Sequence, residues 1–257
     1  MRLRFFTPSV LAGALALLCL PCVASAAIIT TSYGDFAAST LTYKAVTEAS
    51  GSGNPFGSPV YAGNDEIQFL PTTFIAAPDL PALSEIVDSQ IRFTMVANTN
   101  QSIPVLNLKE VGAVTLTGDV ANGGYATAGV GMAIFYHIRA IDGVAVNGPQ
   151  GSLNMTFTPS GGMFDLANGQ LNNQQWTGQL QINFDSILAS KSISGHATTV
   201  EITFDNTLSA ANMNGALATI EKQFVSISVP EPSTAILVLS GTGLLVAARW
   251  RRRTNHQ

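Results

Sequence analysis

The segment that decides the fold class is residues 129–139, which read GVGMAIFYHIR. Its even positions carry large apolar side chains: Val130, Met132, Ile134, Tyr136 and Ile138. Its odd positions carry small or polar side chains, together with Phe135. Successive side chains of a strand point to opposite faces of a sheet, so this period of two predicts a long strand with one buried face.

Shorter runs of the same alternation flank this segment on both sides. They occupy residues 91–95, 114–117, 153–157, 180–184 and 200–204, and a final strand is expected over 220–229. Turn-forming residues separate them, and Asp142-Gly143 between two apolar residues predicts a hairpin. Helical patterns are limited to two short stretches, 79–88 and 210–218, and residues 49–59 are expected to form a loop. The fold class is therefore all-β, an antiparallel two-sheet sandwich, with a jelly roll as one version of it.

Charge and length divide the chain into three parts. The formal net charge is −4, but six of the 12 basic residues lie near the two ends and 15 of the 16 acids lie in residues 27–229. That body of about 203 residues, enough for one domain, therefore carries 6 − 15 = −9. Such an acidic body argues against a nucleic-acid partner, which needs a basic face.

The first 26 residues have the features of a secretory signal peptide. Arg2 and Arg4 precede an apolar run over 10–20, and Ala24-Ser25-Ala26 supplies the small residues for cleavage by signal peptidase before Ala27. The only cysteines, Cys19 and Cys22, fall inside this segment. The mature protein is thus expected to contain neither a disulfide nor a cysteine nucleophile.

The C-terminal segment, residues 230–257, has three parts in a fixed order. Pro230-Glu231-Pro232 forms a stiff spacer, because proline can continue neither a strand ladder nor a helix. An apolar stretch follows, for which we expect a transmembrane helix over about 234–250. Trp250 at the interface and a basic cluster close the segment: Arg249, Arg251, Arg252 and Arg253. The positive-inside rule places these arginines in the cytoplasm and the body outside it.

This tripartite end resembles the PEP-CTERM sorting signal of Gram-negative bacteria that make exopolysaccharide. The resemblance covers residues 229–253 and implies recognition of Pro230, Glu231 and Pro232 by the membrane enzyme exosortase. It further implies an inner-membrane anchor with the ectodomain in the periplasm before processing, and a cell-surface or extracellular location afterwards. Four residues, 254–257, trail the arginine cluster, where many members of the family stop sooner.

Chemistry within the body is marked by few residues. Asp185 and Asp205 end two similar four-residue sequences, INFD and ITFD. Two strands that each end in an Asp at a turn explain this pattern, and the alternative is that neighbouring strands bring the two acids together as a calcium or acid–base site. Trp176 among glutamines could stack on a sugar ring, or lie in the core. His137 and His196 are too far apart in sequence for the usual histidine metal motifs, and no cofactor is expected unless calcium binds.

Three functions follow from these features. The first is a non-catalytic cell-surface or matrix protein associated with exopolysaccharide. The second is a carbohydrate-binding module in which Trp176 contacts the sugar. The third is an envelope glycoside hydrolase, which would need two facing carboxylates among the acids of the body.

Overall fold

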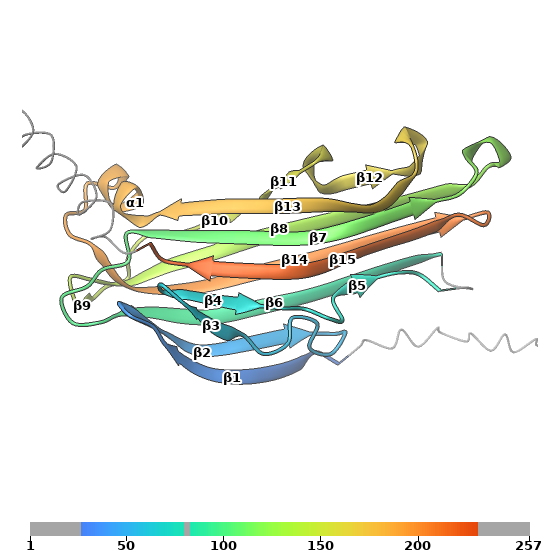
Figure 1. Ribbon diagram of the computed structural model, residues 1–257. Helices are drawn as coiled ribbons and strands as arrows, with labels where there is room; N and C mark the ends of the chain where they lie inside the picture. The colour runs from blue at the N-terminus through green and yellow to red at the C-terminus, as the bar shows by residue number, and fades with distance from the viewer. Residues whose placement is uncertain (1–26, 80–82, 231–257) are drawn as a thin grey trace, which may run out of the picture.

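Two antiparallel β-sheets pack face to face in the computed structural model, which describes residues 27–79 and 83–230 (Figure 1). The long strands alternate between the sheets along the chain: β6 and β8 belong to one sheet, and β7 and β15 to the other. Their inward side chains form a single apolar core. The predicted all-β sandwich is confirmed.

One sheet has eight strands, and β8 lies between β14 and the short strands at one edge. The order is β1 (Ile29–Ala37), β2 (Leu41–Ser50), β6 (Ser84–Ala97), β14 (Ala197–Met213), β8 (Tyr125–Ile141) and β10 (Gln150–Asn154). Two short strands, β9 (Val144–Ala145) and β12 (Met163–Asp165), also pair with β8. Because β8 and β14 each have 17 residues, they run roughly 55 Å and make the domain elongated.

The other sheet has seven strands. The order is β11 (Thr156–Thr158), β13 (Leu171–Asn183), β7 (Val105–Thr117), β15 (Leu217–Ser228), β4 (Glu66–Phe69) and β3 (Val60–Gly63), with β5 (Ile75–Ala76) on β15. The helical elements are short: η1 (Val120–Asn122), η2 (Ser160–Gly162), η3 (Leu166–Asn168) and α1 (Phe184–Ser190). They lie at strand ends or between short strands.

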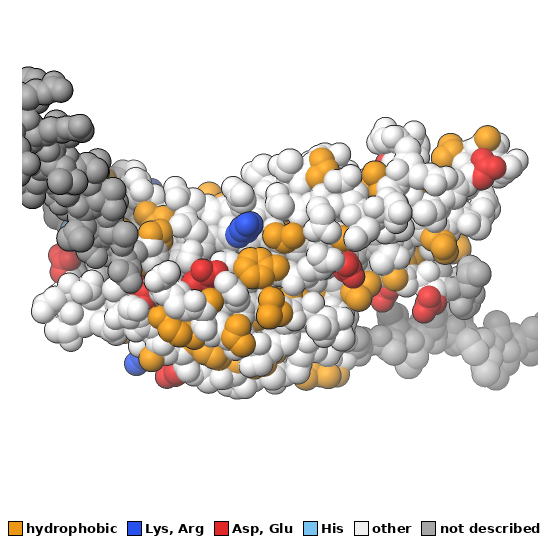
Figure 2. Space-filling view, viewed as in Figure 1, with side chains coloured by type: hydrophobic (Ala, Val, Ile, Leu, Met, Phe, Trp, Pro, Cys, Tyr) orange, Lys and Arg blue, Asp and Glu red, His pale blue; other side chains and the backbone are white. Residues whose placement is uncertain are grey.

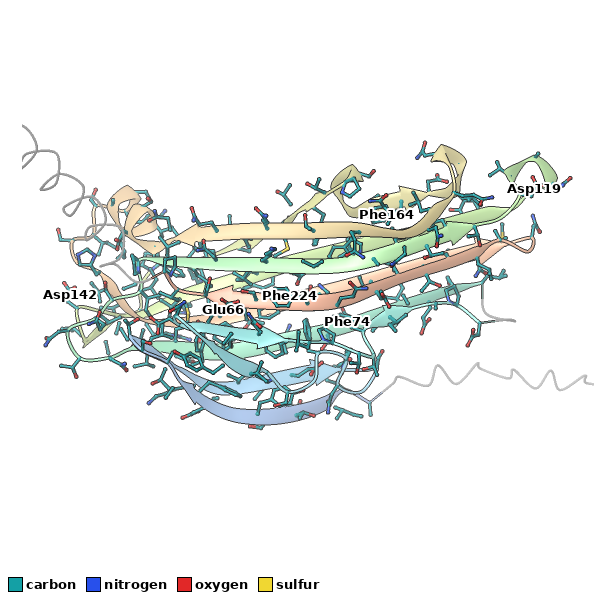
Figure 3. All side chains as sticks on the ribbon, viewed as in Figure 1. Glu66, Phe74, Asp119, Asp142, Phe164 and Phe224 are labelled. Carbon is teal, nitrogen blue, oxygen red and sulfur yellow. The ribbon has the colours of Figure 1, made fainter. Side chains whose placement is uncertain are left out.

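The two ends of the sandwich differ in what they carry. The chain leaves β15 beside α1, and we call this the exit end; Asp142 lies here (Figure 3). The opposite end, which we call the far end, carries η1 and the turn between β14 and β15; Asp119 lies here (Figure 3). On the face seen in Figure 2, charged side chains are few and scattered, as the low charged content of 11% leads one to expect.

The strand predictions hold where inward positions are apolar. Val130, Met132, Ile134 and Ile138 are buried in β8, and the hairpin turns at Asp142-Gly143 as expected. Both turn residues have positive φ, 47° and 79°, which is the conformation that an Asp-Gly hairpin turn needs. The final strand spans Leu217–Ser228 and meets the expected range.

Three sequence predictions are wrong, and one predicted strand is confirmed with a shorter end. Of the expected helix over 79–88, residues from 84 onward lie in β6. Residues 210–218 form the end of β14, a turn and the start of β15, and these two strands belong to different sheets. The run 153–157 is divided at Met155, where the chain crosses from β10 in one sheet to β11 in the other. The strand expected over 180–184 ends one residue early, because Asn183 caps α1 by accepting a hydrogen bond from the amide of Ser186.

Candidate functional site

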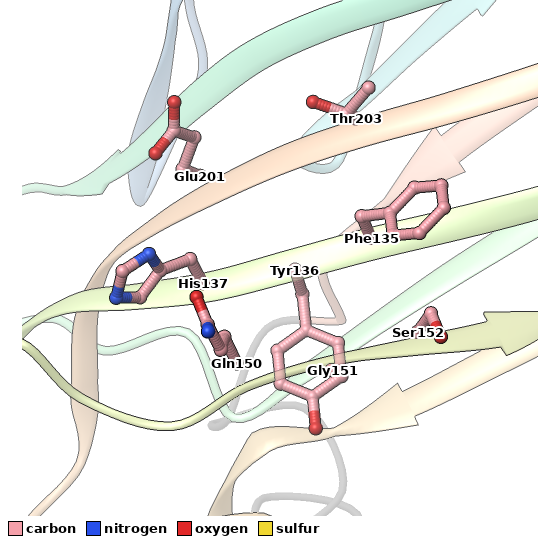
Figure 4. A pocket seen from close by; sticks show the side chains of 8 residues that line it. All are labelled: Phe135, Tyr136, His137, Gln150, Gly151, Ser152, Glu201 and Thr203. Atoms are coloured by element: carbon pink, nitrogen blue, oxygen red, sulfur yellow. The ribbon is translucent and has the colours of Figure 1, made fainter.

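A depression of about 530 Å³ lies on the outer face of the eight-stranded sheet (Figure 4). Strands β8, β10 and β14 supply its lining: Phe135, Tyr136, His137, Gln150, Gly151, Ser152, Glu201 and Thr203. Three adjacent strands thus present side chains to one patch of solvent, with Ser152, Phe135 and Thr203 in one row across the sheet.

The period of two in β8 places Phe135 in this depression. Its neighbours Ile134 and Ile138 are buried, so Phe135 and His137 point outward, and Phe135 is 49% exposed. Large apolar side chains gain about 1.5–3 kcal/mol from burial, so an exposed phenylalanine on a concave face is informative. Phe135 thus presents an aromatic ring to solvent, with hydroxyl, amide and charged groups beside it.

Tyr136 shows how the edge of the depression is built. It lies on the inner face of β8, and its ring packs edge to face with Phe184, 5.9 Å between centroids. A Cβ placed on Gly151 would lie 2.6 Å from the Tyr136 hydroxyl, so glycine is needed there to let the ring pass beneath β10.

An ion-paired carboxylate borders the depression. Glu201 accepts hydrogen bonds from Arg139 at 2.9 Å (Nε) and 2.6 Å (Nη2), and its other oxygen accepts from Arg92. The hydrogen bond from Arg92, then that from Arg139, lowers the pKa of Glu201 below that of a free glutamate. Glu201 is therefore ionised at neutral pH and cannot act there as a proton donor.

A pair of carboxylates, Asp88 and Asp205, lies farther along the same face. In the register of β14 with β6, Asp205 is opposite Gln90 and Thr207 is opposite Asp88, so the two acids are diagonal neighbours. Burial, then the charge of Asp88, raises the pKa of Asp205, and the Thr207 hydroxyl donates to Asp88 at 2.7 Å. Sequence reasoning missed Asp88, because the pairing of β6 with β14 was not visible in the chain.

Trp176 does not offer a stacking surface for sugars. It is fully buried on β13 and packs edge to face with Phe157, with 5.8 Å between ring centroids. The indole fits because residue 112 on β7 is glycine, whose Cβ would lie 2.2 Å from the Trp176 ring. The proposed contact of Trp176 with carbohydrate is therefore wrong, and Phe135 is the exposed aromatic beside a depression.

Asp185 and Asp205 do not form a common site. Asp185 lies in the first turn of α1 at the exit end, where its Oδ1 is 3.0 Å from Nδ1 of His196. Asp205 lies in β14 eight residues beyond Ala197, which separates it from the exit end by roughly 26 Å. Within residues 27–79 and 83–230, no group of three or more His, Cys, Asp or Glu side chains could hold a metal ion.

His196 belongs to a polar cluster at the exit end. Its backbone amide donates to Asp142 Oδ1 at 2.9 Å, and its ring contacts Asp185. The hydrogen bond and charge of Asp185 raise the pKa of His196 above that of a free histidine. His137 lies apart from this cluster, in contact with Asn147 at 3.0 Å.

The C-terminal segment decides the identification. The family model of the PEP-CTERM protein-sorting motif matches residues 228–253, which begin at the last residue of β15. The chain therefore contains a PEP-CTERM sorting domain. The motif implies exosortase as a processing partner and export to the cell envelope or surface. Of the three residues predicted to be recognised by exosortase, Pro230 lies two residues after the end of β15, while Glu231 and Pro232 lie outside the described residues.

The remaining predicted sorting features also lie outside the described part of the chain. These are Ala24, Ser25 and Ala26 before the expected cleavage point, the apolar stretch, Trp250 and the arginine cluster. Ala27 is the first described residue and is exposed. Across the described residues, 27–79 and 83–230, no helix has the length and apolar character needed to cross a bilayer.

Three solved structures are distantly similar to this chain. The enzymatically active domain of tailspike protein 4 of bacteriophage CBA120 has 11% identity and a TM-score of 0.21, covering 76% of this chain and 19% of the tailspike. TmCBM61, solved with β-1,4-galactotriose, has 13% identity and a TM-score of 0.18, covering 72% of this chain and 85% of TmCBM61. A chaperone–tip adhesin complex of CFA/I fimbriae has 9% identity and a TM-score of 0.15, covering 72% of this chain and 51% of the matched chain. These scores are too low to assign a shared fold, and no curated protein matches the chain.

Proposed function

We propose that this protein is a non-catalytic component of the cell surface or extracellular matrix that binds exopolysaccharide through the depression around Phe135. The observation that carries the proposal is an aromatic ring, 49% exposed, among hydroxyl, amide and charged groups from three strands. A sugar ring offers an apolar face and a rim of hydroxyls, so its recognition requires an aromatic surface together with hydrogen-bonding groups.

The electrostatics of the depression favour binding over hydrolysis. A glycosidase of the usual kind uses two carboxyl groups, one of which must be protonated to protonate the leaving oxygen. The lining residues contain one carboxylate, Glu201, and two arginines keep it ionised. In the proposal, Glu201 and the amide of Gln150 act as hydrogen-bonding groups for sugar hydroxyls.

Affinity electrophoresis in gels that contain the polysaccharide of the producing cells tests this proposal. Wild-type residues 27–229 should be retarded, and Phe135→Ala should lose most of the retardation. Tyr125→Ala is the matched control, because Tyr125 is also an exposed aromatic of β8, at the far end and 44% exposed. Equal retardation of wild type and Phe135→Ala would refute the assignment of the binding face.

The route of the protein to its ligand follows from the sorting motif. In the proposal, signal peptidase removes residues 1–26 and the inner membrane holds the C-terminal segment while the ectodomain folds in the periplasm. Exosortase then acts near residues 230–232 and passes the ectodomain to the surface of a Gram-negative cell. The depression lies on a sheet face and not at the exit end, so it stays accessible while the chain is tethered at Pro230.

The pair of Asp88 and Asp205 favours a second candidate, an envelope glycoside hydrolase. Diagonal neighbours across two strands have Cα atoms about 7–8 Å apart. Side chains on such positions can place their carboxyl groups at the spacing of roughly 6.5–9.5 Å that inverting enzymes use. The raised pKa of Asp205 suits a proton donor. Release of reducing sugar ends from the polysaccharide, abolished in Asp88→Asn and in Asp205→Asn, would support this candidate. No release by the wild type would exclude it for that polysaccharide.

A further inference from the structure

Three polar side chains meet inside the apolar core, between the two sheets. Lys222 comes from β15 and Glu110 from β7 in the seven-stranded sheet, and Asn206 comes from β14 in the eight-stranded sheet. All three are buried, with relative exposures of 1%, 0% and 0%. Burying ionisable groups costs several kcal/mol each unless they are neutralised or paired, so a core in a domain of this size rarely contains them without a use.

The amine of Lys222 touches both of the other groups. Its Nζ lies 2.5 Å from Asn206 Oδ1 and also donates to Glu110 Oε2. With a carbonyl bond of about 1.23 Å, this contact places Nζ roughly 3 Å from the amide carbon of Asn206, the separation of a near-attack arrangement. An amine nucleophile, an amide carbon and a carboxyl group therefore share one site.

Aromatic rings enclose the site on several sides. The Lys222 Nζ lies 5.4 Å from the ring centroid of Phe74, 5.6 Å from Trp176 and 5.9 Å from Phe56. All three aromatic side chains are fully buried, and Phe56 reaches the core from the loop after β2. The apolar enclosure excludes bulk water, which favours transfer of the amide from nitrogen to nitrogen over its hydrolysis.

We propose that Lys222 and Asn206 form an intramolecular isopeptide bond, with Glu110 carrying the protons. The neutral Lys222 Nζ attacks Cγ of Asn206, while the carboxyl group of Glu110 donates a proton to the amide. The bond between Nζ and Cγ forms, the proton from Glu110 is taken up by Nδ2, one Nζ proton passes to the Glu110 carboxylate, and the bond between Cγ and Nδ2 breaks. One ammonia leaves, the carboxyl group is regenerated, and no oxidant or metal is consumed.

The protonation states in the core suit this reaction. Burial raises the pKa of Glu110, and burial lowers the pKa of Lys222. Both shifts favour the same neutral pair, a protonated carboxyl group and a free amine. That is the form in which the amine is nucleophilic and the carboxyl group can act as a general acid.

The hydrogen-bond pattern agrees with the proposal. Within the described residues, Asn206 Nδ2 and Glu110 Oε1 are buried without a partner. Buried orphan groups of this kind are rare in native structures because each costs about 1–3 kcal/mol. The proposed bond removes Nδ2 from the core altogether.

The bond would tie one sheet to the other. Asn206 lies in the middle of β14 and Lys222 lies in the middle of β15, so the cross-link would join the sheets near the centre of the sandwich. Residues 27–257 contain no cysteine, so disulfides are not available to this exported domain. An isopeptide bond would supply a covalent cross-link that reducing agents do not break.

Peptide mass spectrometry of the protein isolated from its producing cells tests the proposal. A glutamate-specific protease cleaves after Glu201 and Glu221, so it places Asn206 in peptide 202–221 and Lys222 at the start of the next peptide. We expect these two peptides to be recovered joined, with the mass of their sum less one ammonia. Recovery of peptide 202–221 free and of unmodified mass would overturn the proposal.

Two variants assign the roles of the residues. Lys222→Arg should yield both peptides separately. Asn206 can also lose ammonia by cyclising on its own backbone, and this control shows that the wild-type signal needs Lys222. Glu110→Gln should also yield them separately while its circular dichroism spectrum remains that of a β protein. A joined product in folded Glu110→Gln would overturn the role of Glu110, and the wild-type result stands on its own if either variant does not fold.

Discussion

Replacement of Trp176 by alanine separates the core role of this residue from the sugar-contact role that its sequence context suggested. The side chain is fully buried and packs against Phe157 and over Gly112. Truncation of a buried tryptophan costs about 3–5 kcal/mol. Its Nε1 is a buried donor without a partner in the described residues, and removing such a group is itself stabilising. We therefore expect the free energy of unfolding to fall by about 3 kcal/mol, at the lower end of that range.

Urea unfolding followed by circular dichroism measures this loss. With an m-value of about 2–3 kcal/mol/M for a domain of this size, the midpoint should fall by roughly 1–1.5 M. Trp176→Phe keeps a ring in the cavity and should lose less than half as much. Binding to polysaccharide should be unchanged in both variants below their midpoints. A midpoint within roughly 0.3 M of the wild type, or loss of binding by a folded variant, would refute the placement of Trp176.

Three further predictions concern charged groups and sorting. His196 should titrate in NMR with a pKa above that of free histidine, and Asp185→Asn should lower it. The stability that the His196 imidazolium contributes is fully present below the unfolded pKa of about 6.5 and is lost as the pH rises through the higher folded pKa. The pKa of Glu201 should lie below that of free glutamate, and Arg92→Gln should raise it. The stability that this carboxylate contributes is lost as the pH falls through its lowered pKa. Replacement of residues 230–232 by three alanines should leave an unprocessed, membrane-retained protein, and normal release of that variant would contradict sorting by this motif.

The sequence predicts the sheets where the inward positions are apolar and misses them where they are polar. In β6 the inward set includes Ser89, whose hydroxyl donates to the buried carboxylate of Glu48 at 2.8 Å, so the apolar alternation is interrupted before Ile91. In β14 the inward set continues through Asn206 and Asn212, which are both buried. A search for alternating apolar residues therefore misses these parts of the two strands and finds short helical patterns there instead.

The site was predicted less completely than the fold. The outward position of Phe135 follows from the alternation in β8, but its neighbours Gln150 and Glu201 are set by strand pairing, which no local pattern reveals. The buried cluster did leave a signal in the chain. Asn206 continues the inward series that includes Ile202 and Phe204, and a polar residue in such a series indicates a partner across the core.

The central claim is that the outer face of the eight-stranded sheet is the binding surface. An NMR titration tests it most directly, in which oligosaccharides from the producing cells' polysaccharide are added to isotope-labelled residues 27–229. We predict amide shift changes in the central part of β8, in β10 and in the first half of β14, around Phe135, Ser152 and Thr203. Shift changes confined to the loops at either end of the sandwich, or no changes at saturating oligosaccharide, would contradict the account.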